Sequence, residues 1–151
     1  MDSLDLARGQ LRNLALDNMR RLDVFLGVAD EDVPLMIDAV SRELVDRMAM
    51  NNQFTDDGTA QQLAESAALR ALRLVVPLEP EFWLTDLGRL IAFRVGYGQA
   101  VAPRPHVAMI LGISKQAVAQ QLTRGRLTAA GTSGVTNESL VRRLREVGQK
   151  A

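Results

Sequence analysis

Two prolines, Pro77 and Pro80, limit the folds that this chain of 151 residues can adopt. Proline lacks a backbone N–H and restricts the residue before it, so no helix can continue through the segment from Val76 to Pro80. We therefore predict a boundary between residues 76 and 77. The expected organisation is a helical module over residues 1–76, a hinge with a connecting helix over residues 77–102, and a small domain over residues 103–151.

Apolar residues before this boundary recur at three- and four-residue steps, which is the spacing of one face of an α-helix. The three stripes are Leu11, Leu14, Met19, Leu22, Phe25 and Leu26; Val33, Met36, Ile37, Val40, Leu44 and Met48; and Leu63, Ala64, Ala67, Ala71 and Leu72. We expect three helices that bury these stripes against each other or against a second subunit, so that the module also serves for homodimerisation. The fold class predicted for the whole chain is mainly α.

The connecting segment predicts one further helix. Thr85 and Asp86 can cap its start, and the segment Gly96-Tyr97-Gly98 ends it. Phe82 and Trp83 lie just before this helix, and we expect them to pack as apolar anchors. A weaker alternative is that Trp83 stacks on nucleic-acid bases.

The charge is divided between the two halves of the chain, although the whole chain is neutral. Residues 1–76 carry eight Arg and thirteen Asp or Glu, a balance of −5, whereas residues 77–151 carry ten Lys or Arg and five acids, a balance of +5. From Ala100 onward the balance is +6. Because a basic surface attracts polyanions, this division favours a nucleic-acid partner for the second half.

Residue composition argues against several kinds of site. Cysteine is absent and His106 is the only histidine, so we expect no metal centre and no cofactor. His106 is expected to cap a helix or lie near a phosphate rather than to catalyse. An enzyme is the least favoured class, because no nucleophile, metal set or phosphate-binding loop is evident. The acidic start is unlike a secretory leader and the longest apolar run, Leu74 to Leu78, is too short for a membrane span, so a cytoplasmic protein is expected.

The last third contains two short stretches with helical spacing, joined by a turn. Their apolar positions are Val107, Ala108, Leu111, Ile113, Val118 and Leu122. Gly112 can end the first helix in the left-handed conformation, and Ser114 can cap the second. The outward face of the second helix is then short, polar and free of acids. It consists of Lys115, Gln116, Ala119, Gln120, Thr123 and Arg124.

This segment resembles the helix-turn-helix of transcriptional regulators, through the pattern A-x-x-L-G-I-S-x-x-A-V-x-x-x-L from Ala108 to Leu122. The segment Arg124-Gly125-Arg126-Leu127 follows directly, and after a Gly-rich turn a last helix begins at Asn137. This order is similar to the winged helix-turn-helix of excisionases and of MerR-type regulators. The resemblance covers about residues 103–148.

The resemblance implies a small hairpin, or wing, after the second helix. Leu127 and Val135 would be its inward positions, and the turn would lie at residues 131–134. The tip departs from a DNA-binding wing in having no Arg or Lys. Contacts of the wing with DNA would then come mainly from backbone amides, Thr132 and Ser133, or would not occur.

Together these features predict a sequence-specific, double-stranded DNA-binding transcriptional regulator that acts as a homodimer. The second helix would enter the major groove, where Gln116 and Gln120 read base edges. Phosphate contacts are expected from Lys115, Thr123, Arg124 and Arg126. Arg142 and Arg145 share a face of the last helix, and this face either binds phosphate or is simply solvated. The expected DNA-binding residues are Ser114, Lys115, Gln116, Ala119, Gln120, Thr123, Arg124, Arg126, Arg142 and Arg145.

Two alternatives stay open. The chain could be a helical protein-interaction adaptor that keeps the helix pair only as a scaffold. It could also be a phage or mobile-element factor that bends DNA for recombination or packaging. A DNA reader should lose affinity on Gln120→Ala or Arg124→Ala without unfolding, whereas an adaptor should keep its protein partner.

Overall fold

A computed structural model describes residues 2–26, 33–49, 59–75 and 79–150. The chain is mainly helical, with a small three-stranded antiparallel sheet, so the predicted fold class is confirmed at this level. It divides into two compact units, Met1–Leu78 and Glu79–Ala151. The proline-containing break at residues 76–78 lies outside the described residues. Within the described ranges, no helix combines the length and apolar character needed to cross a membrane.

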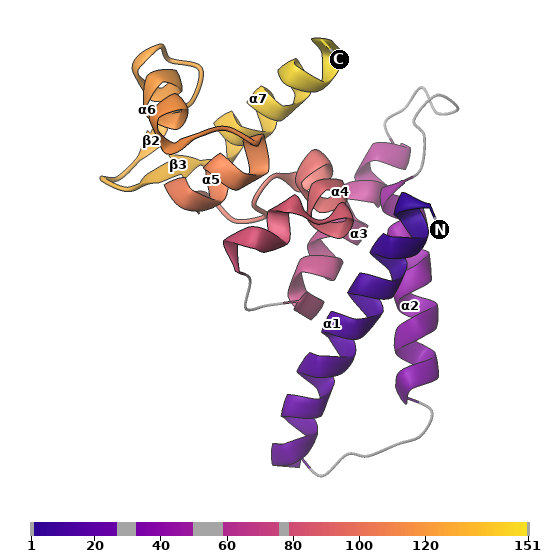
Figure 1. Ribbon diagram of the computed structural model, residues 1–151. Helices are drawn as coiled ribbons and strands as arrows, with labels where there is room; N and C mark the ends of the chain where they lie inside the picture. The colour runs from indigo at the N-terminus through magenta and orange to yellow at the C-terminus, as the bar shows by residue number, and fades with distance from the viewer. Residues whose placement is uncertain (1, 27–32, 50–58, 76–78, 151) are drawn as a thin grey trace. The chain divides into compact units, whose positions relative to one another are not determined.

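The helices and strands follow one another simply along the chain (Figure 1). In its described part, the first unit contains α1 (Ser3–Leu26), α2 (Val33–Met48) and α3 (Thr59–Val75). The second unit contains the 3-10 helix η2 (Pro80–Leu84), α4 (Asp86–Val95), β1 (Val101–Pro103), α5 (Arg104–Leu111), α6 (Lys115–Thr123), β2 (Ala129–Ala130), β3 (Gly134–Thr136) and α7 (Asn137–Lys150).

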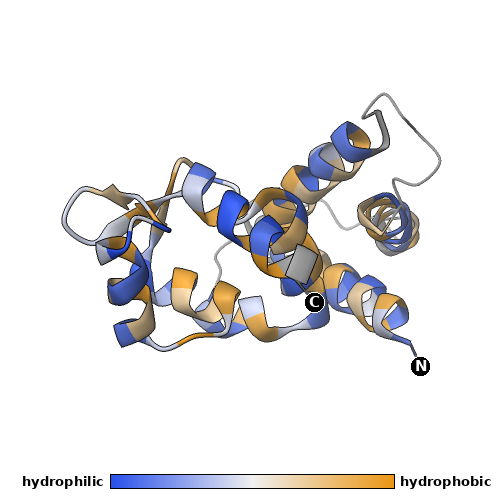
Figure 2. Cartoon of the chain, turned by 90° about the horizontal axis from the view of Figure 1, so that it is seen from above, coloured by the Kyte–Doolittle hydropathy of each residue, from blue (hydrophilic) through white to orange (hydrophobic). Residues whose placement is uncertain are grey.

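In the first unit, α1, α2 and α3 all pack against one another. Figure 2 shows that the helices have hydrophilic and hydrophobic sides, as helices that share a core require. The buried apolar residues are Ala7, Leu11, Ala15, Leu44, Val45, Met48, Ala64, Ala67, Ala68, Ala71, Leu72 and Val75. The side-chain amide of Asn18 donates a hydrogen bond to the backbone carbonyl of Leu74, which joins α1 to α3. Seven of the eleven predicted stripe side chains that the structure describes are therefore buried within one chain.

Four described residues of the predicted stripes do not belong to this buried set, and two of them, Leu14 and Ile37, are half-buried. Val40 of α2 is 45% exposed and Leu63 of α3 is 42% exposed, so neither is buried against the other helices of its own chain, and burial against a second subunit stays a prediction. The inward face of α2 is rotated relative to the prediction and holds Ser41 and Val45, which are buried. Several other predicted stripe side chains lie outside the described residues, namely Met19, Leu22, Phe25, Leu26, Val33 and Met36.

The second unit begins with the apolar anchors that the sequence predicts. Phe82 and Trp83 are buried, and their rings meet edge to face with centroids 5.2 Å apart. Burial removes Trp83 from any role in stacking on nucleic-acid bases. The hydroxyl of Thr85 accepts a hydrogen bond of 3.1 Å from the backbone N–H of Gly88, which confirms the predicted cap of α4.

The sheet has the order β1-β3-β2, and both outer strands run antiparallel to β3. Val101 pairs with Thr136, and Ala129 pairs with Val135. Strand β1 differs from the prediction of a hinge and a connecting helix over residues 77–102. In the structure, residues 79–102 belong to the second unit. There α4 contacts α7, and η2 contacts α5.

Candidate nucleic-acid interface

The turn between α5 and α6 is held by local hydrogen bonds. Gly112 has φ 67° and ψ 36°, the left-handed conformation that glycine adopts without steric cost, as predicted. The backbone N–H of Ile113 donates to the carbonyl of Ala108 at 3.0 Å. The hydroxyl of Ser114 accepts from the N–H of Ala117 at 3.1 Å, which confirms the predicted cap of α6. The start of α6 is therefore fixed relative to the end of α5.

The inward face of α6 anchors this helix to the core of the second unit. Val118 is fully buried in a cluster with residues from α5, the sheet and α7. The other buried members are Ala102, Val107, Ala108, Leu127, Val135 and Leu140. Leu127 and Val135 lie inward, as the resemblance implies, but only Val135 is a strand residue, because β2 begins at Ala129. Because this cluster draws on several elements, α6 is fixed at its side as well as at its start.

The outward face of α6 holds the predicted side chains. All of them are exposed, and so is Ser114 just before the helix. The exposed residues of the face are Lys115, Gln116, Ala119, Gln120, Thr123 and Arg124. Two hydroxyls on this surface already have partners, because Ser114 caps the helix and Thr123 donates to the carbonyl of Ala119 at 3.0 Å. The amides and cations of the face carry most of its capacity for further hydrogen bonds.

No Asp or Glu occurs in the sequence between Asp86 and Glu138. This acid-free segment contains α5, α6 and the hairpin of β2 and β3. The cations of α5, α6 and this hairpin therefore have no carboxylate within their own elements. The prediction from the sequence rests on the charge balance and on the acid-free outward face of α6, and this gap extends the absence of acids to the neighbouring elements.

Arg126 is exposed just beyond α6, and its backbone N–H donates to the carbonyl of Gln121 at 2.9 Å. The hairpin follows, with an exposed tip at residues 131–133. The carbonyl of Ser133 accepts from the backbone N–H of Arg104 at 3.3 Å, which ties the tip to the start of α5. The tip therefore offers the small polar side chains of Thr132 and Ser133.

The two arginines of α7 that are expected to bind phosphate or to be solvated, Arg142 and Arg145, are not the ones that contact α6. That contact is made by Arg143, whose Nε donates to Oε1 of Gln121 at 3.0 Å. Successive helical residues are about 100° apart, so Arg142 and Arg145 point away from this direction. Both are exposed. Arg143, which also pairs with Glu146 at 3.2 Å, joins α7 to α6 in a structural role that the sequence did not indicate.

His106 does not cap α5, because Pro103 occupies the N-cap position. Its Nδ1 instead accepts a hydrogen bond of 3.1 Å from Nε1 of Trp83. Burial lowers the pKa of His106 from its ordinary value of 6.5, although Glu79 and Glu81 act in the opposite direction. Both observations favour a neutral imidazole. His106 therefore contributes to packing within the second unit and not to the exposed face of α6.

The described residues contain no cluster of three or more His, Asp or Glu that could hold a metal ion. Comparisons with known proteins give no relative, since no family model, curated protein or solved structure matches this chain.

Proposed function

We propose that this protein is a sequence-specific, double-stranded DNA-binding regulator of transcription, with α5 and α6 acting as a helix-turn-helix. The observation that carries this proposal is the exposed face of α6, which is polar and free of acids. A helix fixed at its start by Ser114 and at its side by Val118 presents these side chains with little loss of conformational freedom on binding.

The dimensions and chemistry of α6 suit the major groove. An α-helix with its side chains is about 10–12 Å across, and the major groove of B-DNA is about 12 Å wide. Gln116 and Gln120 can each donate to and accept from the edge of an adenine. Lys115, Arg124 and Arg126 supply cations for phosphates or guanines, and the small side chain of Ala119 leaves room for close approach.

In this proposal the hairpin of β2 and β3 is the wing of a winged helix-turn-helix. Its tip carries no cation, so its contacts would come from backbone N–H groups, Thr132 and Ser133. Such contacts position a protein on the sugar–phosphate backbone and do not read sequence. Base readout is therefore assigned to α6 alone.

One such head makes few base contacts, so regulation requires two heads on a repeated site. We assign the pairing of two copies to the first unit, because residues 1–76 carry a net charge of −5. Acidic helices would be repelled by DNA, which favours a protein partner for them and leaves the basic unit for the DNA.

Fluorescence anisotropy with mixed-sequence duplex DNA at low and moderate salt tests the proposal. Binding should weaken steeply with salt, and Arg124→Ala should reduce the salt slope by about 1 if this guanidinium neutralises one phosphate. Arg73→Ala removes an exposed charge from α3 in the other unit and serves as the matched control. Absence of binding even at low salt would overturn the proposal.

Exposed apolar residues on the first unit favour the adaptor as a second candidate. Leu35 of α2 is 72% exposed, and Val40 and Leu69 are also exposed. Large apolar side chains at a surface are typical of a protein-binding face when they gather together. An adaptor of this kind would bind no duplex DNA, and Gln120→Ala would have no effect on its interaction with its protein partner.

A further inference from the structure

Gly9 lies near the middle of the first half of α1. No atom in the described part of the chain approaches it so closely that the position must lack a side chain. A Cβ atom built at this position meets no heavy atom within 4 Å. Glycine weakens a helix interior relative to alanine, because its backbone loses more conformational freedom on folding. Helical spacing places Gly9 opposite the buried residues Ala7 and Leu11. A glycine on an open helix face allows another backbone to approach closely.

The side chains that share this face are divided by charge on the two sides of Gly9. Asp5 and Leu6 lie before it and are exposed, and Leu6 is 48% exposed. Arg12 and Asn13 lie after it, on the same face. The face is therefore acidic and apolar toward the start of α1 and basic toward its middle. Such a pattern is complementary to its own antiparallel copy.

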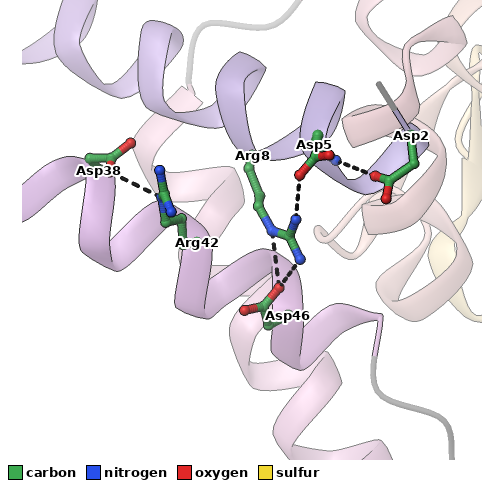
Figure 3. Close-up of polar contacts among 6 residues, drawn as sticks. All are labelled: Asp2, Asp5, Arg8, Asp38, Arg42 and Asp46. Atoms are coloured by element: carbon green, nitrogen blue, oxygen red, sulfur yellow. Dashed lines mark hydrogen bonds and ion pairs between the residues drawn. The ribbon is translucent and has the colours of Figure 1, made fainter.

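Figure 3 shows acids and arginines of α1 and α2 that face one another. Arg8 lies between Asp5, at 2.6 Å, and Asp46 of α2. Arg12 lies 3.6 Å from Asp38, its Nε donates to Oδ1 of Asn13 at 3.3 Å, and its side chain is 43% exposed. Arg8 is therefore committed to the fold of the unit, whereas Arg12 can reach a carboxylate outside it.

These residues line one open groove along α1 and α2. Its cations are Arg8, Arg12 and Arg42, and its acids are Asp5, Asp38 and Asp46. Equal numbers of both signs leave no net charge to attract a strongly charged polymer. The groove instead fits a surface with the same mixture of charges.

We propose that the occupant is a second copy of this chain, with the two α1 helices crossing antiparallel at Gly9. Arg12 of one copy then contacts Asp5 of the other, and the two-fold axis repeats this contact. The stem of Arg12 covers Leu6 of the other copy. A parallel crossing would bring Arg12 against Arg12, so the charges select the antiparallel arrangement. This inference deepens the homodimer of the proposed function, and it is tested without DNA.

A charge-exchange experiment tests the crossing directly by sedimentation equilibrium. Wild-type protein should form a concentration-dependent dimer at micromolar concentration. Arg12→Asp and Asp5→Arg should each weaken self-association by about tenfold or more, because each places like charges together twice. An equimolar mixture of the two variants should dimerise again, since every contact then joins an acid to an arginine. Misfolding of one variant cannot produce this recovery.

Gly9→Ala gives a second, independent readout. The substitution should leave the thermal unfolding of the dissociated protein unchanged or raise its midpoint, since the added methyl meets nothing inside the chain. It should weaken dimerisation by about tenfold, because it separates the crossing helices. Gln62→Ala, an exposed substitution on α3, controls for helix propensity and should leave association unchanged.

Three results would overturn the inference. They are a wild-type protein that stays monomeric up to about 100 µM, a mixture of folded charge variants that does not associate, and a Gly9→Ala protein that dimerises as tightly as wild type. Because sedimentation is measured without DNA, a failed anisotropy experiment leaves these outcomes unaffected. A monomer that still binds DNA would reject the inference and keep the DNA-binding proposal.

Discussion

Nε1 of Trp83 donates a hydrogen bond of 3.1 Å to Nδ1 of His106, which joins η2 to α5 across the core of the second unit. The Tyr97 ring lies edge to face against the His106 ring, with centroids 5.2 Å apart. An imidazole can accept this bond only while Nδ1 carries no proton. The pairing of the only histidine with the only tryptophan therefore makes the second unit sensitive to pH.

Stability should fall as the pH falls below the ordinary histidine value of 6.5. Burial lowers the pKa of His106 in the folded chain, so the unfolded chain binds the proton more strongly. The contribution of neutral His106 to the free energy of unfolding is present above pH 6.5. It is lost as the pH falls from 6.5 through the pKa of His106 in the folded chain. Chemical unfolding followed by Trp83 fluorescence between about pH 5.5 and 7.5 measures this dependence of the unfolding free energy on pH. The range is chosen because ordinary carboxylates titrate below it.

His106→Gln is the control for this measurement, because its amide oxygen can still accept from Trp83 but does not titrate in this range. The variant should show a flatter dependence of unfolding free energy on pH. A wild-type protein with the same stability throughout this range would contradict the assignment.

Gly88→Ala should strongly destabilise the second unit. A Cβ at this position would lie 2.1 Å from the backbone carbonyl oxygen of Phe82, and backbone cannot move aside as a flexible side chain can. We expect a loss of about 3 kcal/mol in the free energy of unfolding, at the upper end of overpacking effects. Urea denaturation followed by Trp83 fluorescence measures it, and Arg89→Ala, exposed on the same helix, should be nearly neutral.

Ser114→Ala should cost about 1 kcal/mol of stability, because the N–H of Ala117 loses its partner at the start of α6. Ser114→Thr keeps a hydroxyl at the cap and should restore most of this loss. Thermal unfolding of the three proteins makes the comparison. Equal stability of the alanine and wild-type proteins would show that the cap does not contribute.

Ala119→Glu should reduce affinity for duplex DNA by about tenfold at low salt while leaving the fold intact. The residue is exposed in the middle of the α6 face, so a carboxylate there is directed at the proposed DNA surface. Gln99→Glu, exposed outside α6, adds the same charge and serves as the control. Anisotropy titrations should separate the two variants, and equal losses would indicate an effect of net charge alone.

Arg143→Ala should lower the unfolding free energy by about 1 kcal/mol, because the bonds to Gln121 and Glu146 are lost. Arg142→Ala, one residue earlier and exposed, should change stability by less than about 0.5 kcal/mol. Differential scanning calorimetry compares the two. A larger loss for Arg142→Ala would contradict the assignment of Arg143 as the link between α7 and α6.

The features predicted best from the sequence depend on residues that are close together in the chain. Thr85 and Ser114 each accept from the N–H three residues later, and Gly112 ends α5 through its own backbone geometry. These signals are complete within one helical turn. The exposed face of α6 follows from them, because a helix with a fixed start and one buried stripe has its remaining positions determined.

Features that depend on distant residues could not be found in this way. Strand β1 has three residues and forms only because β3 pairs with it, as in the pair of Ala102 and Val135. The contact of Arg143 with Gln121 also joins separate helices. For Val40, helical periodicity left a choice between neighbouring faces of α2, and packing selected the face that holds Ser41.

The two outer strands of the sheet are short, and this has a consequence for behaviour at high concentration. Strand β2 contains two residues, and β1 contains three and ends at Pro103, which has no N–H to offer a neighbouring molecule. Unpaired sheet edges are the usual template for aggregation, and short edges with proline resist it. Concentrated solutions should therefore stay free of β-rich aggregates, so that self-association can be studied without precipitation.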